Sequence, residues 1–222
     1  MVNVKKRVLG HLNGITSRLM YIPRRMYHKQ KAKRCNTEKC CIICNNCTGG
    51  MILHDLGLRF DSPTINTLFY SADDFLFFAN NIKSIFECEI VKICDSGYPY
   101  PVGGIKLGNR EIKIGFVHYS TFEEAKKKWI DRFKRVDFDK ILVLWEGNGL
   151  NDNDLELLDK MSFHKLVFSI PNKKYSDKYP FYLGSNIYNN WYPGKILDYK
   201  HPYSLKRYLD DFDYIRFINN GT

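Results

Sequence analysis

The feature that most constrains the fold is a series of short, almost entirely apolar runs separated by amphipathic segments. The runs have the length of strands, and they cover residues 40–44, 89–94, 112–118, 140–145 and 165–170. Segments with helical periodicity lie between them, at residues 48–58, 72–86, 121–133 and 152–161. Strands that are apolar on both faces are typical of a parallel sheet covered by helices. The sequence therefore predicts an α/β protein with an open doubly wound, mostly parallel sheet and helices on both faces.

This pattern also suggests how the 222 residues are divided. We expect a basic arm over residues 1–34 and a single α/β domain over residues 35–222, with its sheet core at about 39–170. Residues 171–222 are rich in Tyr, Phe and Trp and end in a predicted helix over 204–218, and we expect them to cover the core. No apolar run of about 18 residues and no signal peptide is present, so we expect a cytoplasmic protein with reduced cysteines.

The arm at residues 1–34 carries all of the excess positive charge. It holds ten of the 34 Lys and Arg residues and no Asp or Glu; the other 24 basic residues balance the 24 acidic ones, so the net charge of +10 belongs to the arm. An apolar stripe at helical spacing predicts an amphipathic helix that Pro23 ends. The stripe consists of Val4, Val8, Leu12, Ile15, Leu19 and Ile22.

A basic amphipathic helix fits docking on an anionic membrane surface, and the one we expect is the inner face of the cell membrane. The alternative is a helix packed on its own domain or on another subunit, with a solvated basic face. No nucleic-acid-binding motif accompanies the charge, so we do not expect nucleic acid as a partner.

A candidate reactive group follows the first predicted strand, in the sequence Asn-Asn-Cys-Thr-Gly-Gly at residues 45–50. In parallel α/β proteins the carboxyl end of a strand, next to the start of a helix, is a common place for a site. A helix start lowers the pKa of a nearby thiol, which makes Cys47 a candidate nucleophile. The alternative is that Cys47 is a small buried hydrophobic residue in a tight turn.

The residues around this cysteine are candidate hydrogen-bond donors to a substrate. The main-chain N–H groups of Gly49 and Gly50 are candidates for binding a developing oxyanion. The side chains of Asn45 and Asn46 are candidates for further donors.

A metal site is the competing interpretation of the same stretch. Cys41, Cys44 and Cys47 have the C-x2-C-x2-C spacing of some iron–sulfur proteins. However, an extended segment places Cys41 and Cys44 on opposite faces of the sheet. We therefore expect no metal.

A cysteine nucleophile needs a base, and His118 is the first candidate because it ends the predicted strand at 112–117. Glu146, which ends the strand at 141–145, is a candidate for the third member, a carboxylate that supports His118. If all these strands are parallel, both side chains lie at the same edge as Cys47. Glu123 and Glu124 are rival carboxylates. His54, in the predicted first helix of the sheet domain, faces either the site or the surface.

Two aromatic residues are candidates for substrate binding. Tyr100 belongs to a turn-rich loop at residues 98–104, which is a candidate lid over the site. Trp191 belongs to the aromatic segment 188–192, which is a candidate platform for sugar rings. Ordinary loop residues that cover the edge of the sheet are the alternative for both.

Several short motifs, in order along the chain, resemble a bacterial family of exopolysaccharide or capsule biosynthesis proteins, long catalogued as a domain of unknown function. These motifs are residues 45–50, 54–58, 62–64, 100–103, 118–119, 123–125 with Trp129, and 212–214. A more distant resemblance is to capsule acetyltransferases of the WcbI type, which also place an Asn-Cys after their first strand.

The resemblance implies an acyltransferase, for example an acetyltransferase, in which Cys47 is the reactive thiol and His118 its partner. It further implies acetyl-coenzyme A or a related acyl-coenzyme A as donor, and a surface polysaccharide or its lipid-linked sugar precursor as acceptor. An esterase or deacetylase that uses the same site, and a non-enzymatic, membrane-docked adaptor of a polysaccharide assembly complex, remain open as alternatives.

Overall fold

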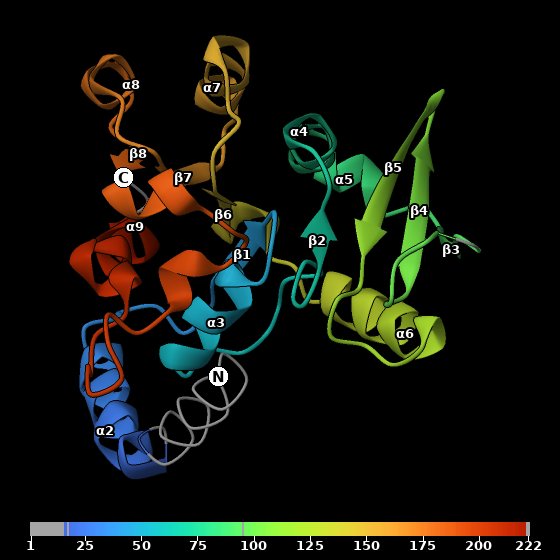
Figure 1. Cartoon of the computed structure of the whole chain (residues 1–222). Helices are drawn as coiled ribbons and strands as arrows, with labels where there is room; N and C mark the ends of the chain where they lie inside the picture. The colour runs from blue at the N-terminus through green and yellow to red at the C-terminus, as the bar shows by residue number, and fades with distance from the viewer. Residues whose placement is uncertain (1–15, 17, 95, 221–222) are drawn as a thin grey trace, which may run out of the picture.

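The computed structural model describes residue 16 and residues 18–94 and 96–220, and it contains a four-stranded parallel sheet. The strands lie in the order β1 (Cys41–Cys44), β6 (Ile141–Glu146), β7 (His164–Ser169) and β8 (Tyr182–Gly184). Neighbouring strands are parallel throughout, with Cys44 opposite Leu144. The predicted α/β fold with a parallel sheet is confirmed (Figure 1).

A second four-stranded sheet is antiparallel, which the sequence analysis did not foresee. Its order is β2 (Leu68–Phe69), β5 (Arg110–Gly115), β4 (Val102–Leu107) and β3 (Ile90–Lys92). The segments at 89–94 and 112–118 were predicted to be parallel strands of the main sheet, and this was wrong. Leu107 pairs with Arg110 across the two-residue turn Gly108-Asn109, and strands joined by so short a turn must be antiparallel.

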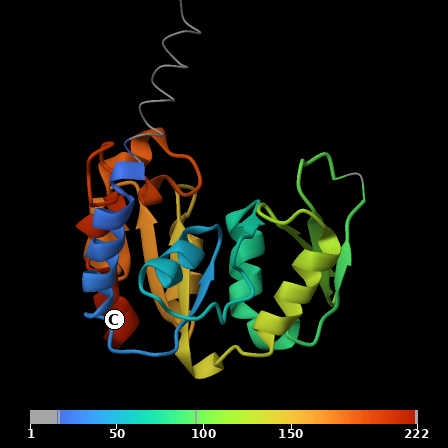
Figure 2. The same ribbon diagram turned by 90° about the horizontal axis from the view of Figure 1, so that it is seen from below.

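Helices and other segments cover both faces of the parallel sheet. On one face Ile42 packs with Ile52 and Leu53 of α3 (Thr48–Asp55) and with the chain after β8. On the other face Ile43 packs in a core that includes α4 (Ala72–Asn80), α7 (Asp152–Lys160) and the antiparallel sheet. Figures 1 and 2 show the two sheets as two halves that lie side by side.

The remaining elements complete the chain. They are the helices α5 (Ile82–Ile85), α6 (Phe122–Phe133), α8 (Lys173–Lys178) and α9 (Tyr214–Asn220), and the short 3-10 helices η1 (Phe138–Lys140), η2 (Asn186–Asn190), η3 (Lys195–Leu197) and η4 (Tyr208–Asp211). A single last helix over 204–218 was predicted, but η4 and α9 take its place.

The described part of the basic arm forms α2 (Tyr21–Ala32), which lies beside the C-terminal segment in both ribbon views (Figures 1 and 2). The prediction that Pro23 ends the helix was wrong, because Pro23 lies in the first turn of α2, where a proline is tolerated. The first four residues of the predicted apolar stripe, up to Ile15, lie outside the described residues. In the part of the chain that the structure describes, no helix is long and apolar enough to span a membrane.

Candidate functional site

The candidate site is built where β1 and β6, two neighbouring parallel strands, reach their carboxyl ends. The side chain of Asn45 continues the pairing of these strands: its Oδ1 accepts a hydrogen bond from Glu146 N (2.9 Å), and its Nδ2 donates to Glu146 O (3.0 Å). The main-chain oxygen of Asn45 accepts a bond from Phe69 N of β2 (2.9 Å). Asn45 therefore joins both sheets at this point, and its amide is used within the protein.

Glu146 is fully buried at the end of β6, and three donors hold its carboxyl group. Asn46 Nδ2 lies 2.5 Å and Gly194 N 3.0 Å from Oε2, while Trp191 Nε1 lies 3.2 Å from Oε1. Burial raises the pKa of Glu146 above its ordinary value, although these hydrogen bonds act in the opposite direction. A buried carboxyl group with a raised pKa is a candidate general base.

Two further polar atoms near the end of this sheet, Thr48 Oγ1 and Asn148 Oδ1, are buried without a hydrogen-bond partner among the described residues. The buried hydroxyl of Tyr188 lies beside the Glu146 carboxyl and interacts with it. Burial and the neighbouring Glu146 carboxylate raise the pKa of Tyr188. Unpaired buried polar atoms are rare in folded proteins, so Thr48 Oγ1 and Asn148 Oδ1 are consistent with a site for a polar ligand at this end of the sheet.

The start of α3 is capped by the residue that precedes its N-cap position. Cys47 is the N-cap residue, and Thr48 is the first residue of the helix. The side chain of Asn46 supplies the capping interaction instead, because its Oδ1 accepts a bond from Thr48 N (2.9 Å). Asn46 therefore links the helix start to Glu146 through the two ends of one amide.

Trp191 closes the site from the C-terminal segment, and Gly147 makes room for it. A Cβ atom at residue 147 would lie 2.5 Å from the Trp191 ring, and φ of Gly147 is +131°. Both the space and the backbone conformation therefore require glycine. The structure thus brings together four predicted site residues, Asn45, Asn46, Glu146 and Trp191.

Cys47 adjoins this group in the chain but is not an activated thiol in this structure. It is half-buried, and no hydrogen bond from its Sγ occurs among the described residues. Burial raises the pKa of Cys47 to about 11, contrary to the lowering predicted from the helix start. At such a pKa only about one thiol in ten thousand is ionised at pH 7. The cost of burying the charge outweighs the field of a helix of only eight residues.

Gly49 and Gly50 allow α3 to pack closely against its neighbours. A Cβ at Gly49 would lie 2.8 Å from Cys44 Cβ, so glycine allows α3 to lie directly against β1. Burial raises the pKa of the Cys44 thiol to about 12, and the N–H groups of Asn46 and Gly49 lower it, so the Gly49 N–H interacts with that thiol. Gly50 is buried beside Ile65.

The predicted histidines do not join the group. His118 was expected at the edge of the parallel sheet, but β5, the strand before it, belongs to the antiparallel sheet. His118 is exposed and forms no hydrogen bond with Cys47. His54 lies in the last turn of α3, about 9 Å along the helix from Thr48, and it contacts Asp55. Glu123 and Glu124 are exposed in the first turn of α6.

Tyr100 belongs to a row of stacked rings next to the site. Its ring centroid lies 5.4 Å from that of Tyr98, which lies 4.8 Å from that of Tyr70. Tyr70 directly follows Phe69, whose N–H bonds to Asn45, so the row begins beside the ends of the parallel strands. Stacked, partly exposed rings are suited to bind the flat face of a sugar ring.

The cysteines of the first strand point in different directions. Cys41 packs in the core shared with the antiparallel sheet, whereas Cys44 packs on the opposite face with α3. The predicted opposite orientation is confirmed. Among the residues that the structure describes, no group of three His, Cys, Asp or Glu side chains is arranged to hold a metal ion.

Comparisons with known proteins place the chain among relatives but assign no activity. The model of a family described as "Domain of unknown function (DUF1919)" matches residues 20–219. A protein of Haemophilus influenzae (strain ATCC 51907 / DSM 11121 / KW20 / Rd), described as an uncharacterized protein, is 31% identical over 182 residues, which cover 81% of this chain and 84% of that protein.

Proposed function

Because the chain belongs to the DUF1919 family, which is defined by its sequence and not by an activity, we propose a function from the candidate site: an acyltransferase that acetylates a sugar hydroxyl. The acceptor would be a capsule or exopolysaccharide, or its lipid-linked precursor, as the sequence resemblance implies. The observation that carries the proposal is the buried Glu146 carboxyl, held by Trp191 and by Asn46, the residue before Cys47.

In the proposed reaction Glu146 is the general base. Its carboxylate would accept the proton of the acceptor hydroxyl while the hydroxyl oxygen forms a bond to the acyl carbon. The thioester C–S bond would then break, and the leaving coenzyme A thiolate would take up that proton from Glu146, which restores the carboxylate. Asn46 and Trp191 hold the carboxylate in place, and Trp191 limits the access of water. The raised pKa of Glu146 makes it a stronger base than an exposed glutamate.

Cys47 has a smaller role in this proposal than the sequence analysis gave it. Its thiol is protonated at neutral pH, so it lines the acyl-binding position and is not itself the base or a ready nucleophile. Acetyl-coenzyme A or a related acyl-coenzyme A would supply the activated acyl group as a thioester. The uncharged Cys47 side chain and the buried, unpaired Thr48 hydroxyl fit a short acyl group with one carbonyl oxygen.

The acceptor sugar would lie over aromatic rings. Trp191 contacts Glu146 at the end of β6, and the row of Tyr70, Tyr98 and Tyr100 begins at the residue after Phe69, whose N–H bonds to Asn45. We place the enzyme at the inner face of the cell membrane, where a lipid-linked acceptor is within reach of the site.

The test is acetyl transfer from labelled acetyl-coenzyme A to oligosaccharides of a surface polysaccharide, followed by mass spectrometry. Glu146→Gln should lose at least about a hundredfold in rate, as is usual for a general base. Asp61→Asn, which changes a buried carboxyl group outside the site, is the matched control, and Cys88→Ala is the control for Cys47→Ala. Thermal unfolding shows whether each variant is folded.

Three results would contradict the proposal. They are no transfer by the wild-type protein to any acceptor, wild-type transfer by Glu146→Gln, and release of free acetate without transfer. The last result would identify a hydrolase that uses water in place of the sugar hydroxyl.

A further inference from the structure

The helix α2 buries polar side chains against the protein and exposes apolar ones to solvent, which is the reverse of the usual arrangement. A helix on the surface of a globular protein normally turns its apolar side toward the core. In α2 the buried side chains are Arg24, His28 and Lys31. The side chains of Ile22 and Met26 are 66% and 67% exposed, and Leu19, one turn earlier, is 69% exposed.

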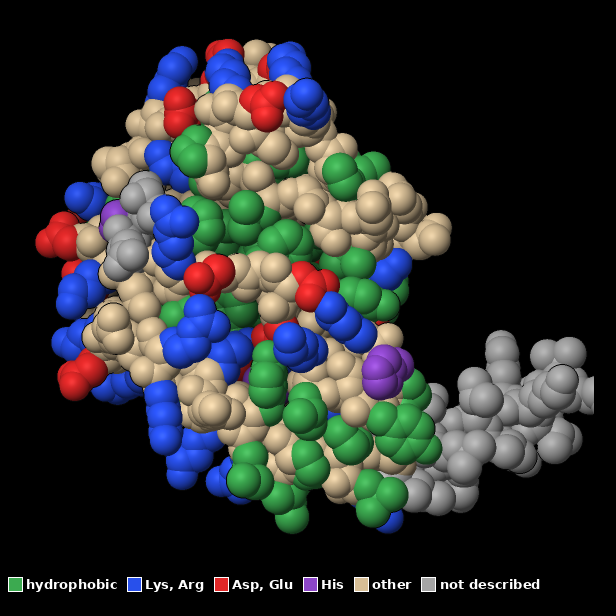
Figure 3. All heavy atoms as spheres, turned by 90° about the vertical axis from the view of Figure 1, so that its left-hand side faces the viewer, with side chains coloured by type: hydrophobic (Ala, Val, Ile, Leu, Met, Phe, Trp, Pro, Cys, Tyr) green, Lys and Arg blue, Asp and Glu red, His purple; other side chains and the backbone are tan. Residues whose placement is uncertain are grey.

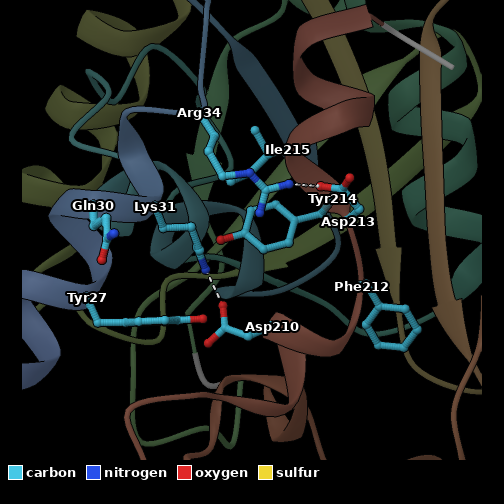
Figure 4. Close-up of a pocket in the computed structure, with 9 residues that line it drawn as sticks. All are labelled: Tyr27, Gln30, Lys31, Arg34, Asp210, Phe212, Asp213, Tyr214 and Ile215. Atoms are coloured by element: carbon cyan, nitrogen blue, oxygen red, sulfur yellow. Dashed lines mark hydrogen bonds and ion pairs between the residues drawn. The ribbon is translucent and has the colours of Figure 1, made fainter.

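Ion pairs with the C-terminal segment fix the helix in this orientation. Lys31 pairs with Asp210, and Arg34 Nη2 lies 2.8 Å from Asp213 Oδ1 (Figure 4). These residues line a cavity of about 470 Å³ together with Tyr214, over whose ring Lys31 Nζ lies at 4.6 Å. Both cations among the described residues that line this cavity therefore have a carboxylate partner.

Arg24 holds a loop of the C-terminal segment beside α2, and this loop adds to the exposed apolar surface. It donates to Pro202 O (2.6 Å) and Ser204 O (3.0 Å), and its guanidinium lies 3.6 Å from the centroid of the Tyr199 ring. These contacts hold the loop at residues 202–205 beside α2. Tyr203, in this loop, is 68% exposed.

The helix and the loop form one continuous surface. Leu205 and Met26 line the same shallow groove, together with Pro23. We call this surface the α2 outer face, and it consists of Leu19, Tyr21, Ile22, Met26, Tyr203 and Leu205. Figure 3 shows hydrophobic side chains gathered on this side of the molecule, over its lower part, with Lys and Arg side chains beside them.

The charge around the α2 outer face has one sign. Arg18, Arg25, Lys29 and Lys33 are exposed, and none of them forms an ion pair with another described residue. The helix α2 contains no Asp or Glu. An exposed apolar strip flanked by unpaired cations, with tyrosines at its edge, is complementary to the headgroup region of an anionic lipid bilayer.

We propose that the α2 outer face binds an anionic lipid bilayer, with its apolar side chains at the boundary between headgroups and acyl chains and its cations beside lipid phosphates. This deepens the proposed function, on which it rests for its biological purpose, since docking would hold the site near a lipid-linked acceptor. The binding itself involves no residue of the candidate site.

The test is flotation of the full chain with lipid vesicles, in the absence of substrate. One set of vesicles contains phosphatidylcholine alone, and the other also contains about 30% phosphatidylglycerol, an anionic lipid. The wild-type protein should bind the anionic vesicles, and binding should weaken at high salt. Ile22→Glu with Met26→Glu should lower the partition coefficient at least about tenfold. Val91→Glu with Leu157→Glu is the matched control, because both residues are exposed and apolar but lie elsewhere.

A second pair of variants tests the charges. Replacing Arg25, Lys29 and Lys33 by Gln should reduce binding to anionic vesicles about tenfold or more. Replacing Lys127, Lys128 and Lys134 by Gln removes the same charge from α6 and its C-cap residue and should leave binding unchanged.

Four outcomes would overturn the proposal. They are no binding by the wild-type protein, equal binding to neutral vesicles, wild-type binding by the double Glu variant, and a dimer in sedimentation that the same variant converts to a monomer. The last outcome would assign the face to contact between two copies of the chain. None of these results depends on acetyl transfer, so failure of this proposal and failure of the proposed function are distinguishable.

Discussion

Asn46 Nδ2 lies 2.5 Å from Glu146 Oε2, and this contact joins residues that are 100 positions apart in the chain. It links the loop after β1 to the end of β6, the neighbouring strand. The other end of the same amide accepts the N–H of Thr48 at the start of α3. One side chain therefore couples the position of the buried carboxylate to the position of the helix that follows Cys47.

The first prediction concerns the pH dependence of stability at Glu146. Burial raises the folded-state pKa of Glu146 above its ordinary value of 4.5, so the folded protein binds this proton more tightly than the unfolded chain does. The contribution to stability is therefore complete below about pH 4.5 and is lost as the pH rises through the folded-state pKa. We expect the free energy of unfolding of the wild-type protein, minus that of Glu146→Gln, to fall by up to about 1.4 kcal/mol per pH unit in this range.

Urea denaturation of both proteins between pH 4 and pH 8 measures this difference. The absolute stability of Glu146→Gln also includes a cost of about 1–3 kcal/mol, because its amide N–H group faces donors in place of an acceptor. This cost does not change with pH, so it does not affect how the difference between the two proteins varies with pH. A constant or rising difference would show that the pKa of Glu146 is not raised.

The second prediction concerns the space that Gly147 leaves for Trp191. Gly147→Ala introduces a Cβ at 2.5 Å from the ring and strains a backbone with φ of +131°, so it should cost about 2–4 kcal/mol and expose the indole. Gly149→Ala is the matched control, because φ is +102° there but nothing lies within 4 Å of the added atom. Its cost should be limited to backbone strain, about 1–2 kcal/mol. Chemical denaturation and quenching of Trp fluorescence measure both effects, and equal costs would contradict the contact between Gly147 and Trp191.

The third prediction concerns the reactivity of Cys47. Since the thiolate is the reactive form and the pKa is raised to about 11, the rate of alkylation should rise about tenfold per pH unit from pH 7 to pH 10. Mass spectrometry of peptides after brief treatment with iodoacetamide gives this rate for Cys47, and Cys94, which is exposed, reports accessible thiol in the same sample. A rate for Cys47 that levels off below pH 8 would show that the pKa of its thiol is lowered, as expected for an activated nucleophile.

The sequence predicted the fold correctly where the apolar pattern of a strand agrees with how that strand pairs in the sheet. The apolar runs that became β1, β6 and β7 are buried on both faces, and they form the predicted parallel sheet. The run that became β5 was assigned to the wrong sheet, because its apolar residues could fit either arrangement and the Gly108-Asn109 turn before it was not recognised. Glu146 was found from its position at the end of a strand.

The rest of the site depends on contacts that the sequence does not display. Tyr188 is a neighbour of Trp191 in an aromatic segment, and nothing in the pattern shows that its hydroxyl lies beside Glu146. The position of His118 was inferred from a strand direction that the pairing of β5 overturns. The raised pKa of Cys47 follows from burial, which a motif of six residues cannot show.

The last prediction concerns His28, which joins α2 to the sheet domain. Its Nδ1 lies 3.4 Å from Asp55 Oδ2, and its Nε2 lies 3.3 Å from the Tyr199 hydroxyl. Burial lowers the pKa of His28 below 6.5; Arg207 and Lys31 act in the same direction, and Asp55 and Asp210 act against it. The unfolded chain therefore binds this proton more tightly, and stability is present above about pH 6.5 and lost as the pH falls toward the folded-state pKa.

We expect His28→Gln to reduce this loss of stability below pH 6.5, by up to about 1.4 kcal/mol per pH unit. Its control is His201→Gln, which changes an exposed histidine in the segment next to α2. Urea denaturation from pH 8 to pH 5 gives the slopes, and hydrogen exchange of α2 amides shows whether the helix detaches first. Equal slopes for the wild-type protein and His28→Gln would mean that protonation of His28 does not weaken the attachment of α2. A reduced slope, together with early exchange in α2, would show that acid releases the helix that carries the α2 outer face.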